Sequence, residues 1–68
     1  MMNPTVGDLV LLQGSMWSSY GREGDIGVLI ETKFLTNRNG YPGAEFSLVL
    51  WGDGEAKLYK TEHLEVVQ

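Results

Sequence analysis

The stretch that decides the fold is Glu45–Val67, EFSLVLWGDGEAKLYKTEHLEVV. Its first part, Phe46–Trp51, alternates two sets of side chains with the period of two that a pleated strand requires. The segment Gly52–Gly54 supplies residues that tolerate positive φ, as a tight turn demands. Ala56–Tyr59 alternates again and predicts a return strand. The stretch therefore predicts a β-hairpin.

The chain after the hairpin predicts one helical turn and a closing strand. Thr61 is of a residue type that caps helical turns, and we expect it to cap a single turn that ends near His63. Leu64–Val67 is apolar enough to form a last strand.

Two more strands precede the hairpin. The apolar run Leu9–Leu12 predicts the first, and Ile26–Thr32 predicts the second, with Lys33–Leu35 as its extension. Gly27, inside the second strand, predicts either a bulge or a close approach of another backbone.

Two long connections separate these strands. Gln13–Asp25 is rich in glycine and serine, and Lys33–Ala44 contains the turn signals Asn39-Gly40 and Pro42-Gly43. Five short strands leave edges that invite aggregation, and closure of the sheet removes edges. We therefore expect an all-β fold closed into a small five-stranded barrel.

The order of these elements resembles that of SH3-like barrels, with a short 3-10 turn before the last strand. The resemblance is carried by Val6–Val10, Gly24–Val28, Leu50–Gly54 and His63–Val66. The first two blocks are similar to the KOW motif of ribosomal and transcription-elongation proteins. The last two resemble Tudor-type barrels and small uncharacterised bacteriophage proteins.

A looser likeness, through Ser19-Tyr20, Gly24–Gly27 and the closing strand, is to the type of small barrel found in one component of photosystem I. The resemblance to SH3-like barrels runs from Val6 to Val67 and implies that residues 1–68 form a single SH3-like domain. It also implies a phage-encoded protein.

Length and composition limit the kinds of site that this chain can contain and the ways in which its fold can be stabilised. A chain of 68 residues is one domain with a thin core, and it contains no cysteine, so disulfides and thiolate metal sites are excluded. Stability must come from packing, from a partner or from self-association, which makes a homo-oligomer one expectation. We expect no cofactor, no membrane segment and a cytoplasmic location, in the host cell if the protein is phage-encoded.

The formal net charge of −4 disfavours nucleic acid, because binders neutralise phosphates with a basic surface and only five bases are present. No catalytic set is visible either. His63 is the only histidine, and we interpret it as structural or solvated rather than catalytic. We therefore expect a protein that is not an enzyme.

Aromatic side chains are the strongest functional signal. Trp17, Tyr20 and Tyr41 fall in the two long connections, where the resemblance to SH3-like barrels implies a ligand groove. Exposed Trp and Tyr mark interfaces, since they give large contact area at low entropic cost. Arg22 and Arg38 lie in the same connections and offer charged contacts.

Trp51 and Tyr59, at strand ends, are instead expected to cap the core. The sequence thus predicts a protein-interaction or accessory module that binds a protein or peptide through its loop aromatics. Binding of nucleic acid by a KOW-like module is the alternative.

Overall fold

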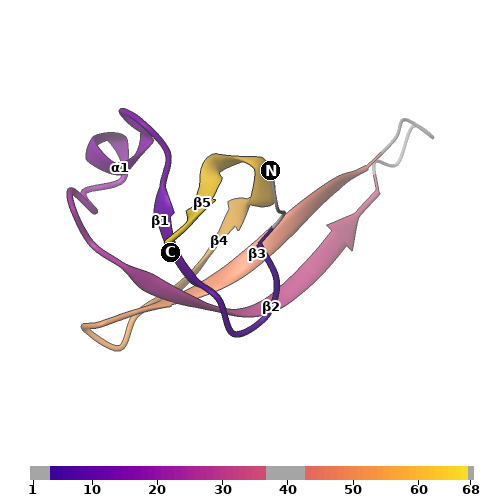
Figure 1. The fold of residues 1–68 in the computed structure, drawn as a ribbon. Helices are drawn as coiled ribbons and strands as arrows, with labels where there is room; N and C mark the ends of the chain where they lie inside the picture. Colours follow the sequence, from indigo (N-terminus) through magenta and orange to yellow (C-terminus); the bar gives the residue numbers. More distant parts are fainter. Residues whose placement is uncertain (1–3, 37–42, 68) are drawn as a thin grey trace.

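A computed structural model describes residues 4–36 and 43–67 (Figure 1). The chain there forms one β-sheet, a single turn of α-helix and a 3-10 turn. In chain order the elements are β1 (Leu9–Leu12), α1 (Met16–Ser19), β2 (Gly27–Leu35), β3 (Ala44–Trp51), β4 (Ala56–Lys60), η1 (Thr61–His63) and β5 (Leu64–Val66). The expected all-β class is confirmed, and the strand positions agree with the sequence prediction to within a few residues.

The five strands lie in the order β4-β3-β2-β1-β5, and every neighbouring pair is antiparallel. β2, β3 and β4 form a meander of neighbours in sequence. β1 and β5 come from opposite ends of the described chain and lie side by side, with Leu12 paired to Leu64 (Figure 1). β4 and β5 are therefore the two edges of the sheet.

Closure of the sheet into a barrel is not confirmed. No ladder joins β4 to β5 within residues 4–36 and 43–67, and the 3-10 turn η1 connects these two strands instead. The sheet is strongly curled, but it remains open along that line (Figure 1).

The hairpin between β3 and β4 forms as predicted. Gly54 adopts a φ of 88°, a left-handed conformation that favours glycine. The amide of Gly54 donates to the carbonyl of Trp51 over 2.9 Å, and the amide of Trp51 donates to the carbonyl of Glu55 over 2.8 Å.

The predicted turn before the last strand is confirmed as η1, but the role given to Thr61 is wrong. Lys60 occupies the N-cap position, and no side chain caps the turn. Thr61 is buried, and its hydroxyl shares a 2.7 Å hydrogen bond with the hydroxyl of Ser47 on β3. The hydroxyl pairs there because two buried polar groups satisfy each other away from water.

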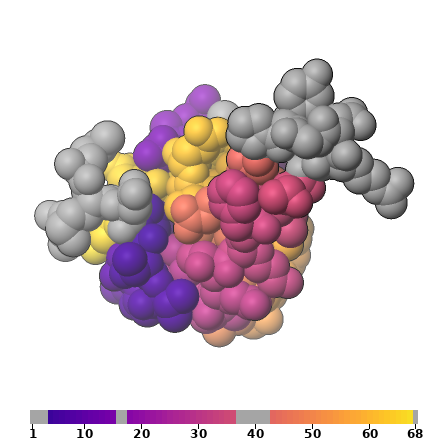
Figure 2. Space-filling view, turned by 90° about the vertical axis from the view of Figure 1, so that its right-hand side faces the viewer, coloured from indigo at the N-terminus to yellow at the C-terminus, as the bar shows by residue number. Residues whose placement is uncertain are grey.

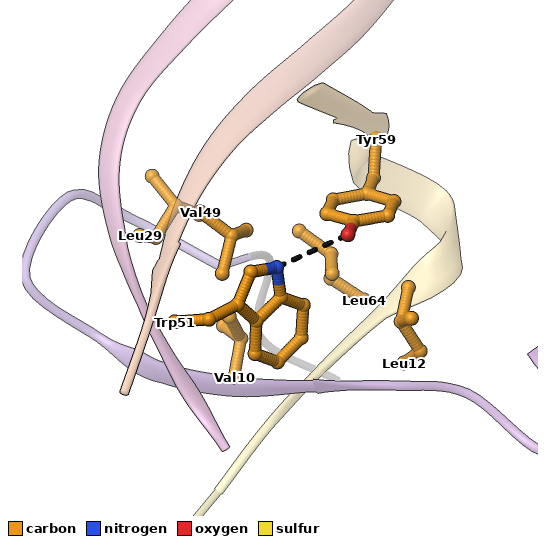
Figure 3. Packing of buried hydrophobic residues seen from close by; sticks show 7 residues of the cluster. All are labelled: Val10, Leu12, Leu29, Val49, Trp51, Tyr59 and Leu64. Carbon is orange, nitrogen blue, oxygen red and sulfur yellow. Dashed lines mark hydrogen bonds between the residues drawn. The ribbon is translucent and has the colours of Figure 1, made fainter. Parts of the chain in front are cut away.

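The core lies on the inward face of the curled sheet. Each of the five strands contributes at least one side chain to it, so the core holds all strands together (Figure 3). The buried apolar residues are Val10, Leu12, Leu29, Val49, Trp51, Tyr59 and Leu64.

Both features predicted from Gly27, a close approach and a bulge, occur in β2. A Cβ at Gly27 would collide with Val49 Cγ1 and lie 3.0 Å from the carbonyl oxygen of Leu50, so the backbones approach closely here. The bulge lies slightly farther on, where the β2–β3 register shifts between Leu29 and Glu31. The shift lets one strand carry an extra residue and bends it.

Candidate functional site

Arg22 joins the connection between β1 and β2 to the β3–β4 hairpin through ion pairs. The guanidinium of Arg22 lies 3.4 Å from Asp25 of its own loop, 3.0 Å from Asp53 in the hairpin turn and 2.8 Å from Glu55 beyond it. Arg22 is only 8% exposed, whereas the three carboxylates remain open to solvent. We call these four side chains the Arg22 cluster.

Three aromatic rings that contact one another edge to face lie next to the Arg22 cluster. The Arg22 guanidinium sits 4.9 Å from the centre of the Trp51 ring, in cation–π geometry. Trp51 Nε1 donates a 3.0 Å hydrogen bond to the Tyr59 hydroxyl (Figure 3). Tyr20 meets Tyr59 edge to face, with ring centres 5.1 Å apart and planes at 80°.

We call these three rings, Tyr20, Tyr59 and Trp51, the aromatic platform. Trp51 and Tyr59 are buried, but Tyr20 keeps 48% of its surface exposed. The platform therefore presents one ring to solvent and supports it from inside with two others. Such an arrangement restricts the conformations of an exposed aromatic side chain.

The electrostatics of the cluster favour the ionised form of Asp53. The pKa of Asp53 lies below its ordinary value of 3.8, first because the amide of Glu55 donates to its Oδ1 over 2.9 Å. The hydrogen bond from Arg22 lowers it further. A lowered pKa in the folded state adds stability above the unfolded pKa, and this stability is lost as the pH falls through the folded value.

We expect Arg22→Met to lower the thermal midpoint at neutral pH, because three carboxylates then lose their common counter-ion. The difference from the unsubstituted protein should shrink as the pH falls from about 4, where Asp53 takes up a proton in the unfolded chain, through the lower pKa that it has in the folded protein. Thermal melts between about pH 7 and pH 2 measure this.

Lys57→Met is the matched control, since it also removes one positive charge near Glu55 but from an exposed 3.0 Å ion pair. Exposed pairs contribute little. A midpoint difference for Arg22→Met that stays constant over the whole pH range would contradict the electrostatic role.

Of the site residues predicted from the sequence, the structure describes the side chains of Tyr20 and Arg22. Tyr20 is exposed and supported, and Arg22 is buried and paired within the chain. Trp17 belongs to α1, but its side chain is outside the described part of the structure, as are Arg38 and Tyr41 altogether. Their roles in binding stay predictions.

Sequence reasoning does not place Trp51, Tyr59 or the three carboxylates in one site with Tyr20 and Arg22. By sequence alone the carboxylates are typical surface acids, and Asp53 is typical of a turn. One signal is available, because Asp53 and Glu55 in the hairpin turn concentrate negative charge that attracts a base from a neighbouring loop.

The remainder of the described structure offers no second cluster of this kind. His63 has a buried Nδ1 that makes no hydrogen bond among residues 4–36 and 43–67. Within the same residues, no group of three or more metal-ligating side chains is found, and no helix has the length and apolar character to cross a membrane.

A half-open hollow of about 360 Å³ is lined by Gly43, Ala44, Glu45, Lys60, Thr61 and Glu62.

Comparisons with models of known protein families, with curated proteins and with solved structures give no match.

Proposed function

We propose that this chain is a non-enzymatic protein-interaction or accessory module of SH3-like type, which binds a protein or peptide at the exposed side of the aromatic platform. The order of the five strands and the 3-10 turn before β5 support the SH3-like assignment. A phage-encoded protein acting in the cytoplasm of the host cell fits the sequence resemblance.

The observation that carries this proposal is the state of Tyr20. Its ring is half exposed and yet held edge to face by the buried Tyr59, which Trp51 fixes in turn. Ordering a mobile side chain costs binding free energy, so an aromatic ring that is already held contributes more of its contact area to affinity. Rigid aromatic anchors are the residues on which interfaces depend most.

Arg22 stabilises this surface, because its guanidinium pairs with Asp25 in the connection between β1 and β2 and with Asp53 and Glu55 in the β3–β4 hairpin. Trp17, in the turn that precedes Tyr20, belongs to the same proposed binding surface. The connection that contains Arg38 and Tyr41 runs from Leu35 to Ala44, at the opposite end of the β2–β3 ladder from Trp51, so contacts by these two residues are a separate prediction. A partner with an apolar or aromatic anchor and a basic flank suits it, since Asp25, Asp53 and Glu55 expose their outer sides nearby.

We expect Tyr20→Ala to weaken partner binding by ~2 kcal/mol or more, a loss of roughly 30-fold, while the thermal midpoint changes little. The ring is an anchor for the partner but is only partly buried in the free protein. Affinity capture from the source cell, followed by titration of the captured protein against each variant, measures the loss. Trp17→Ala should behave in the same way.

Phe34→Ala is the matched control, because Phe34 is an aromatic residue of β2 that is 65% exposed and does not belong to the platform. Equal losses for Tyr20→Ala and Phe34→Ala would remove the platform from the function. Recovery of nucleic acid that stays bound at about 200 mM salt would instead favour the KOW-like alternative, since weak electrostatic binding is lost there.

A further inference from the structure

The outward face of the sheet carries a group of neighbouring apolar side chains, although an open sheet normally turns polar side chains to water. The inward residues of each strand are buried, so their neighbours along the chain point outward. The register sets four of these outward residues in one row across four strands, with Leu9 opposite Val28, Val28 opposite Leu50 and Leu50 opposite Ala56.

A second apolar row lies beside the first. Leu48 on β3 is paired with Leu58 on β4 and with Glu31 on β2, and Ile30 lies at the register shift beside Glu31. We call these two rows the outer face. Leu9, Ile30, Leu50 and Leu58 on it are each between 39% and 49% exposed.

The surface around this region is continuous in space. The register places the two rows at neighbouring positions of adjacent strands, and in Figure 2 the indigo segment that leads into β1 lies beside the magenta strand β2. Monomeric proteins seldom leave a contiguous apolar surface of this kind without a binding role.

We propose that the outer face is the contact surface of a symmetric homodimer, in which two copies of this chain pack sheet against sheet. The surface is separate from the aromatic platform, because Tyr59 points into the core from β4 whereas Leu58 points out. The proposal does not depend on the proposed function.

Charge selects a second copy as the occupant. The chain has a net charge of −4, so most of its surface repels another copy. The outward charges of the sheet cancel, because Glu31 and Glu65 are matched by Lys33 and Lys60. This face is therefore one on which two acidic chains meet without net repulsion.

The arrangement of these charges is also self-complementary. Lys33 and Lys60 flank Phe46 in the row beyond Leu48, at one end of the outer face. Glu65 is paired with Leu11 beyond the other end. A two-fold rotation that reverses the order of the rows turns the lysine end of one copy toward the glutamate end of the other.

The available area comes close to the need of a dimer. The strands β1 to β4, of four, nine, eight and five residues, present about 420 Å² in projection at about 3.4 Å per residue and about 4.8 Å between strands. Two such faces exclude nearly the ~1,000 Å² that a specific interface requires, before the relief of the side chains is counted. Lys33, Lys60 and Glu65 lie at the two ends of the outer face, as the polar rim of an interface does, whereas Glu31 lies within its second row.

Sedimentation equilibrium between about 10 and 200 µM tests the proposal, and we expect the mass to rise toward twice the 7.6 kDa of the chain. Leu50→Glu should weaken the dimer at least ~100-fold, because each copy then brings a carboxylate into the apolar centre. Leu58→Glu should do the same from the neighbouring row. Far-UV circular dichroism establishes that each variant is folded.

Val6→Glu is the matched control, since Val6 is 61% exposed but precedes β1 and lies outside the two rows. It should leave the dimer intact. A chain that stays monomeric over the whole range overturns the proposal, even if another protein is found to bind this face. A dimer that survives both Leu50→Glu and Leu58→Glu in folded protein overturns it equally.

Discussion

Trp51→Ala is expected to leave little folded protein at room temperature. Trp51 is 2% exposed and stands in the core between strands, with Arg22 over one face and Tyr59 at its ring nitrogen. Removal of a buried Trp typically costs ~3–5 kcal/mol. At roughly 0.05–0.15 kcal/mol per residue, a domain of this size has a total stability of about 3–10 kcal/mol.

Urea denaturation of Trp51→Ala, followed by circular dichroism, measures the loss. Trp51→Phe separates the ring from its N–H group, because it retains most of the apolar volume but leaves the Tyr59 hydroxyl without its donor. Tyr20→Ala serves as the exposed comparison from the same platform and should unfold close to the unsubstituted protein. If Trp51→Ala and Tyr20→Ala lost equal stability, the packing described for Trp51 would be wrong.

Gly27→Ala should also destabilise the fold, by ~1–3 kcal/mol. The added methyl group would collide with Val49 Cγ1 and would lie 3.0 Å from both the carbonyl oxygen of Leu50 and Cε3 of Trp51. The carbonyl belongs to the paired strand and moves only if β2 and β3 separate. A single methyl group is therefore expected to disturb the longest ladder in the sheet.

Gly52→Ala is the control for Gly27→Ala. Both substitutions reduce the freedom of the unfolded chain equally, but a Cβ at Gly52 has no atom within 4 Å and the residue does not need positive φ. Equilibrium unfolding of both variants gives the difference. A Gly27→Ala protein as stable as Gly52→Ala would show that β2 and β3 tolerate a wider spacing.

Local signals predict most of the fold. The alternation in Phe46–Trp51, the glycines of the hairpin turn and the short turn before Leu64 each depend on neighbours in sequence, and the structure forms all three. Closure is different, because it depends on the curl of the whole sheet and on how two distant edges meet. The structure leaves those edges unpaired within its described residues.

The sequence also does not predict which face of each strand points inward. In β3 both sets of alternate residues are largely apolar, so hydrophobicity alone does not say whether Val49 or Leu50 points inward. The structure buries Val49 and exposes Leu50. An ambiguity of this kind arises when both faces of a strand are apolar, as the proposed outer contact requires.

The candidate site is likewise predicted only in part from the sequence. The composition of their loop singles out Tyr20 and Arg22, but their supports, Trp51 and Glu55, are about thirty residues away and meet them only through the fold. No spacing rule in the sequence joins a loop arginine to the turn of a later hairpin. Long-range ion pairs are the part of such a site that the sequence does not predict.

The pairing of β1 with β5 has a consequence for the order in which the chain folds. The meander of β2, β3 and β4 joins strands that are neighbours in sequence and is available early, whereas the side chain of Gln13 reaches the carbonyl of Leu64 across 51 positions of sequence. Contacts of such high order slow folding. During synthesis β1 can pair with β2, but it stays without β5, its second partner strand, until residue 66 has emerged, and in this interval the free edge of β1 leaves the nascent protein open to misassembly.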